Sequence, residues 1–171
     1  DELIAGYFKH PRNGMKRQWG EFVARWPWEW LVTLTCTDDT HEERAIKLYR
    51  AWIMRLNKIV FGPRWHKKPS RGVGWVVAVE YQKSGRIHLH ALVAGVGQTR
   101  RLDLMDIWFD LDRLAGIPRI VPVQNSAAVS NYVTKYVTKG GEIHFSPNLK
   151  DISGDLVALA NNPRTDSTPE R

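Results

Sequence analysis

Cysteine is nearly absent from this chain: Cys36 is the only one among 171 residues. A single thiol excludes an internal disulfide and any zinc site built from several cysteines. Long apolar runs are also missing, and none approaches the roughly 20 residues that span a bilayer. The segment Asp1–Arg12 lacks the basic start and apolar stretch of a secretory signal. We therefore expect a cytoplasmic protein without a membrane partner.

Acidic residues are in the minority. The chain has 18 of them against 25 lysines and arginines, a net charge of +7, which favours a polyanionic partner such as nucleic acid. Eight tryptophans are present, and several lie among basic residues, a mixture that suits stacking on unpaired bases or, alternatively, ordinary core packing. The tryptophans in such surroundings are Trp19, Trp26, Trp28, Trp30 and Trp65.

Turn-forming residues divide the chain into segments. Residues 1–27 form a basic, aromatic lead-in, residues 28–146 carry the apolar patterns of a folded domain, and residues 147–171 are a polar tail or linker. Runs rich in β-branched and aromatic residues predict strands, and apolar residues at helical spacing predict helices. The predicted strands are Trp28–Thr37, Val73–Tyr81, Arg86–Ala94 and Arg119–Val123; the predicted helices are His41–Val60, Leu102–Ala115 and one from Asn125 or Ser126 to about Lys139. This order predicts an α+β fold, a central antiparallel β-sheet with helices packed mainly on one face.

Two histidines, His88 and His90, lie two apart in a predicted strand, so both side chains project from the same face. A two-residue turn before this strand would pair Glu80 with Leu89 and send the carboxylate to the other face. A three-residue turn with Gly85 in the left-handed position pairs Glu80 with His88 instead. Two imidazoles and one carboxylate on one face suit a divalent metal ion, Mn²⁺ or Mg²⁺, with zinc chemically feasible. The alternative is a pair of packed or surface histidines.

A second group of reactive side chains lies in Asn131–Lys139, which has the sequence NYVTKYVTK. At about 100° per residue, Tyr132, Lys135, Tyr136 and Lys139 fall on one helical stripe. Lysine favours formation of a phenolate and neutralises phosphate charge, so the stripe suits a tyrosine nucleophile. The alternative is a solvated basic face with two exposed tyrosines.

Three motifs together resemble the HUH endonucleases of rolling-circle replication initiators. Leu31–Thr35 resembles the strand of motif I, Ile87–Leu92 (IHLHAL) resembles the His-hydrophobic-His metal motif, and Tyr132–Lys139 resembles the doubled tyrosine motif of phage-type initiators. The resemblance spans about residues 28–141 and implies a ferredoxin-like or RRM-like palm. The tyrosines follow the histidines, which favours an initiator over a relaxase, whereas HUH single-strand transposases share this order and stay an alternative.

The resemblance also implies a mechanism. A divalent cation on the Glu80, His88 and His90 set polarises the scissile phosphate, and a tyrosine attacks it, leaving a 5′-phosphotyrosine and a free 3′-OH that can later be rejoined. Tyr136 is our hypothesis for the first nucleophile, because Tyr136 to Lys139 followed by glycine is similar to the single-tyrosine pattern; Tyr132 would be its alternating partner. Lys135 and Lys139 would contact the phosphate or the phenolate.

The implied partner is single-stranded DNA at an origin hairpin or nick site, in the cytoplasm of a prokaryotic host. No GxxxxGK[ST] phosphate loop is present, so we expect a separate helicase. Candidate strand-binding segments are Lys16–Arg25, Arg64–Arg71, Arg100 and Arg101. Two other classes compete: a non-catalytic module that binds single-stranded nucleic acid, and a small zinc hydrolase. Both leave the tyrosine stripe unused.

Overall fold

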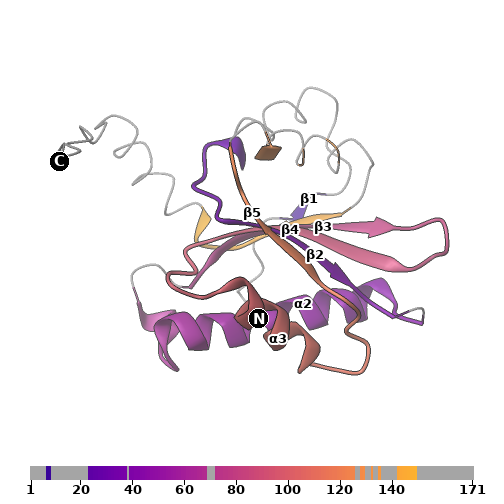
Figure 1. The fold of residues 1–171 in the computed structure, drawn as a ribbon, viewed down its shortest axis with the longest axis horizontal. Coiled ribbons are helices and arrows are strands. Elements are labelled where there is room, and N and C mark those ends of the chain that lie inside the picture. The colour runs from indigo at the N-terminus through magenta and orange to yellow at the C-terminus, as the bar shows by residue number, and fades with distance from the viewer. Residues whose placement is uncertain are drawn as a thin grey trace, which may run out of the picture.

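The computed structural model describes residues 7–8, 23–37, 39–68, 72–125, 128–129, 132, 135 and 142–149. A six-stranded sheet in the order β1-β6-β3-β4-β2-β5 forms its centre (Figure 1). All of its strand pairs are antiparallel. The strands are β1 (Tyr7–Phe8), β2 (Trp30–Thr35), β3 (Gly74–Tyr81), β4 (Ile87–Ala94), β5 (Arg119–Pro122) and β6 (Ile143–Phe145). The helices are α2 (Glu42–Phe61), α3 (Arg101–Phe109) and the short 3-10 helix η1 (Trp65–Lys67).

Helices α2 and α3 both pack on one face of the sheet (Figure 1). The amphipathic pattern of α2 buries Trp52, whose indole Nε1 donates to the Leu104 carbonyl of α3 at 3.0 Å. Trp108 of α3 is also fully buried, and its Nε1 donates to the Gly116 carbonyl at 3.0 Å. Both indoles thus fill the main core while their polar nitrogens stay satisfied. The predicted α+β architecture is confirmed.

The opposite face of the sheet is divided into two halves. Apolar side chains of β3, β4 and β6 near one end are covered by residues from other parts of the chain, and together they form a second core. The covering residues are Val23, Trp26, Trp28, Val129 and Leu149. Trp26 and Trp28 are buried there, and the Trp28 indole donates to the Val23 carbonyl at 2.6 Å, so neither ring is exposed to stack on a base. Toward the other end, where β3 turns into β4, the same face is polar.

Two features differ from the sequence prediction. Helix α3 ends at Phe109 instead of Ala115, because the Asp112 carboxylate accepts from the Leu114 amide at 3.0 Å and starts a turn. Strands β1 and β6 were not predicted, since they have only two and three residues and no measurable alternation. Of the predicted third helix, the described residues Ala128, Val129, Tyr132 and Lys135 are helical, and the rest lies outside the described part of the chain.

Candidate active site

The β3–β4 hairpin sets the register of the candidate metal ligands. Glu80 pairs with His88, as the three-residue turn predicts. Gly85 has φ of +84°, and its amide donates to the Gln82 carbonyl at 2.8 Å, which closes the loop. A left-handed third residue is the geometry that glycine supplies at low cost. The predicted register is therefore confirmed, and Glu80, His88 and His90 lie on one face.

His90 is held between two polar side chains. Its Nε2 lies 2.6 Å from Glu80 Oε2, and its Nδ1 lies 3.3 Å from the hydroxyl of Thr33, the residue opposite it on β2. Burial is the largest cause that lowers the pKa of His90 to about 4, and the nearby charges of His88 and Lys135 act in the same direction, against Glu80. The imidazole is therefore neutral at pH 7, the state in which a ring nitrogen can bind a metal.

His88 has a similar outer partner. Its Nδ1 lies 3.2 Å from the side-chain amide of Gln82, and the two histidine rings are 5.9 Å apart between centroids. Burial lowers the pKa of His88, and the charge of Arg86 adds to this effect while that of Glu80 opposes it. In His90, Nδ1 can donate to the Thr33 hydroxyl, the arrangement typical of imidazoles that bind metal through Nε2, whereas the Gln82 amide nitrogen donates to Nδ1 of His88.

The donor set fits a divalent cation in its chemistry. Glu80 Oε2 and His90 Nε2 are in direct contact at 2.6 Å, closer than the roughly 3 Å between two ligands each about 2.1 Å from one metal ion, so the pair would separate slightly to admit a cation. Within the described part of the chain, however, no three such side chains converge into a closed metal cluster. The His88 ring lies 5.9 Å from that of His90 between centroids and contacts Gln82.

Tyr132 lies over this site. Its ring centroid is 6.0 Å from that of His90 in an edge-on arrangement, and its hydroxyl donates to the Val32 carbonyl of β2 at 3.1 Å, with the Ala91 carbonyl 3.5 Å away. Lys135 is exposed and near enough to His90 for its charge to oppose protonation of that ring. One end of the predicted stripe is therefore beside the histidines. Tyr136 and Lys139 lie outside the described residues.

A comparison with known families identifies the family of this chain. The family model described as replication-associated protein ORF2 matches residues 29–141 of the 171. The chain belongs to this family. Its role is therefore in the initiation of DNA replication. No curated protein and no solved structure matches the chain. Among the described helices of this replication-associated protein, none is long and apolar enough to cross a membrane.

The structure of this replication-associated protein also brings polar and basic side chains to the site that sequence reasoning missed. Arg86 precedes His88 by two residues, so the period of β4 places it on the same face. Thr35 lies opposite His88, and Arg119 lies opposite Thr33 on β5, which puts both on the face of the histidines. The alternation of β4 could have identified Arg86. The cross-strand neighbours could not be found, because they depend on which strands pair.

Two of the expected strand-binding segments lie elsewhere. Arg64 to Lys68 follow α2, whose C-terminal end is fixed near the start of β3 by Asn57, which accepts from the Val73 amide at 2.8 Å. Arg100 and Arg101 follow the end of β4, which lies at the same end of the sheet as the start of β3. Six residues of β3, a length of about 20 Å, lie between this end of the sheet and Glu80. The remaining parts of the expected segments, residues 16–22 and 69–71, fall outside the described chain.

Proposed function

We propose that this replication-associated protein nicks and rejoins single-stranded DNA at an origin, through a tyrosine nucleophile and a divalent cation. The observation that carries the proposal is the hairpin register, which places Glu80 opposite His88 and on the face of His90. The contact between the buried His90 and the Glu80 carboxylate contributes little to the stability of the fold, because burying a polar pair costs about as much as the contact returns. The same pair is a suitable half of a metal site. The family's role in replication favours an origin nickase over a single-strand transposase.

Glu80, His88 and His90 would hold the cation, Mn²⁺ or Mg²⁺. When bound, such an ion neutralises charge on a phosphate oxygen and makes the phosphorus easier to attack. Thr33 would accept from Nδ1 of His90, so that this ring presents Nε2 to the cation. Lys135, together with Lys139, would add positive charge beside the phosphate.

The covalent step exchanges one phosphodiester for another. The tyrosine oxygen loses its proton and bonds to phosphorus, the bond from phosphorus to the 3′ oxygen breaks, and that oxygen takes up a proton. The products are a 5′-phosphotyrosine and a free 3′-OH. Because a phosphodiester is retained, attack by a 3′-OH on the phosphotyrosine reverses the step and rejoins the strand. Positioning of the nucleophile and charge neutralisation supply the rate.

The contacts of Tyr132 support Tyr136 as the first nucleophile. The Tyr132 hydroxyl donates its proton to the carbonyl of Val32, in the middle of the sheet. A backbone carbonyl cannot accept the proton outright, so Tyr132 would have to break this bond before attack. We therefore assign Tyr132 to the second, alternating step.

The proposal is tested by trapping the covalent product. The protein is incubated with a randomised single-stranded DNA library and Mn²⁺, and a slower band is sought on a denaturing gel. We expect an adduct that disappears with a chelator, with His88→Ala and with Tyr136→Phe, and that persists at first turnover with Tyr132→Phe. Lys58→Ala on the exposed surface of α2 serves as the matched control and should leave the adduct unchanged.

Two results would contradict the proposal. An adduct that forms equally well in chelator would exclude the role of the metal ion. Single-strand binding without any adduct, over a library large enough to contain the target, would instead favour the non-catalytic binding module.

A further inference from the structure

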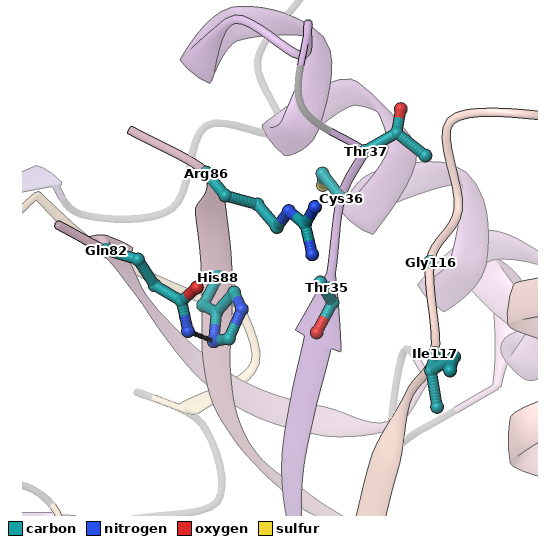
Figure 2. A pocket seen from close by; sticks show the side chains of 8 residues that line it. All are labelled: Thr35, Cys36, Thr37, Gln82, Arg86, His88, Gly116 and Ile117. Atoms are coloured by element: carbon teal, nitrogen blue, oxygen red, sulfur yellow. Dashed lines mark hydrogen bonds between the residues drawn. The ribbon is translucent and has the colours of Figure 1, made fainter. Parts of the chain in front are cut away.

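A pocket of about 450 Å³ lies beside the histidines, where β2 ends and β4 begins (Figure 2). This volume falls within the range of about 300 to 1,000 Å³ that is usual for small-ligand sites. Its lining residues are Thr35, Cys36, Thr37, Gln82, Arg86, His88, Gly116 and Ile117. Since His88 forms part of the wall, the pocket and the proposed metal site are adjacent, and a ligand that fills one reaches the edge of the other.

The chemistry of the pocket suits a phosphate group. Figure 2 shows the Arg86 side chain extending from β4 into the space between His88 and the end of β2. Thr35 contributes its side chain on the β2 side of the pocket, whereas the hydroxyl of Thr37 lies 3.5 Å from that of Thr40. A guanidinium binds phosphate oxygens through paired hydrogen bonds, and hydroxyls are frequent additional donors to the DNA backbone.

The outer wall adds an apolar surface. Ile117 is 77% exposed and lies on the segment between α3 and β5 that borders the pocket. The backbone there is fixed, because the Gly116 amide donates to the Thr35 carbonyl at 2.8 Å. A Cβ at position 116 would lie only 2.9 Å from that carbonyl oxygen, so the close approach depends on glycine. A single exposed isoleucine is ordinary on a protein surface, but this one is held against a cationic pocket.

We infer that this pocket binds one nucleotide of the single strand, next to the phosphate that is cut at the histidines. Its phosphodiester contacts Arg86 and Thr35, and its base or sugar packs on Ile117. The inference rests on the proposed function. The pocket is the part of the protein that places the DNA strand over His88. Cys36 takes no chemical part, because burial raises the pKa of its thiol to about 11.

The test separates strand binding from cutting. Fluorescence anisotropy with a dye-labelled random single-stranded oligonucleotide is measured in chelator over a range of salt concentrations. The variants are Arg86→Gln and Ile117→Ser, with Arg55→Gln on the exposed surface of α2, across the sheet, as the matched control. Log K falls as log salt rises, and loss of one phosphate contact from single-stranded DNA makes this fall less steep by about 0.7 in slope. We expect this decrease and a five- to tenfold weaker affinity, as an order of magnitude, for Arg86→Gln.

Ile117→Ser should weaken binding about threefold and leave the salt slope unchanged, since it removes apolar contact and no charge. Because Ile117 is exposed, this variant keeps the test valid if Arg86→Gln fails to fold. Equal affinity and slope for Arg86→Gln and Arg55→Gln, in a protein that still forms the tyrosine adduct, would overturn the pocket alone. Failure of the wild-type chain to bind single-stranded DNA would overturn both the pocket and the proposed function.

Discussion

His90 illustrates how much a single side chain depends on its neighbours. The imidazole contacts Glu80 through one nitrogen and the Thr33 hydroxyl through the other. When Nε2 binds a metal ion, Nδ1 must carry the proton, and the Thr33 oxygen is placed to accept it. Such outer partners fix the tautomer and orientation of a ligand and commonly change metal affinity by about 10- to 100-fold. We therefore expect Thr33 to strengthen metal binding although it would not itself be a ligand.

The change Thr33→Val tests this role because valine has nearly the same shape and lacks the hydroxyl. We expect Mn²⁺ affinity, measured by isothermal titration calorimetry, to fall about 10-fold or more. Thr33→Ser should recover most of the loss, since it keeps the oxygen. An unchanged Mn²⁺ affinity in a folded Thr33→Val protein would show that His90 needs no partner at Nδ1.

At the scale of secondary structure, the β3–β4 hairpin is the element on which the site depends. Its strand pattern and its glycine are both visible in the sequence, and of the two registers that they allow, the three-residue turn uses the left-handed glycine. For this reason the positions of Glu80 and the two histidines could be predicted from the sequence alone. A slip of one residue would turn Glu80 to the helix-covered face and separate it from His88.

Substitution of Gly85 tests the turn. No atom lies within 4 Å of a Cβ added at this position, so any cost comes from the backbone at φ of +84°. We expect Gly85→Val to lower the free energy of unfolding by about 1–2 kcal/mol, measured by urea denaturation. Gly85→Asn should cost less, because asparagine tolerates the left-handed conformation. Equal stability of the valine variant and the wild-type chain would mean that the turn is not left-handed in solution.

Other elements could not be predicted for physical reasons. Strand β6 has three residues and is a strand because β3 offers it an unpaired edge. Helix α3 has an apolar pattern that continues to Ala115, yet the Asp112 side chain competes for backbone amides and ends it early. The Thr33, Thr35 and Arg119 neighbours of the site depend on strand order, which local sequence does not encode.

Over the whole molecule, one face of the sheet is covered by helices and the other carries the candidate site. One face is covered by α2 and α3 and supplies most of the core (Figure 1). The other carries a small second core at one end and the histidines, Arg86 and Thr35 toward the other. A rigid sheet with helices behind it suits a site in which ligand positions must not drift.

The single cysteine reports on the integrity of this main core. Cys36 is fully buried, and burial raises the pKa of its thiol to about 11 from 9.0. The thiol pKa is higher in the folded chain than in the unfolded chain. The contribution of Cys36 to the free energy of unfolding is therefore complete below pH 9.0 and is lost as the pH rises through about 11. At pH 8 we expect Ellman's reagent to label the native chain very slowly and to titrate one thiol in urea. Rapid stoichiometric labelling of the native chain would contradict the packed core.

The central claim is that a tyrosine of this chain becomes covalently joined to DNA, and the sequence makes the linkage simple to map. Lys135 lies between the two candidate tyrosines, so trypsin separates them into the peptides 120–135 and 136–139. The trapped adduct would be digested with nuclease and trypsin, and the nucleotide-bearing peptide identified by mass spectrometry. We expect the added nucleotide mass on Tyr136 after a single turnover, with Tyr132 modified only when a second cut is allowed. A first adduct on Tyr132, or on neither residue, would contradict this expectation.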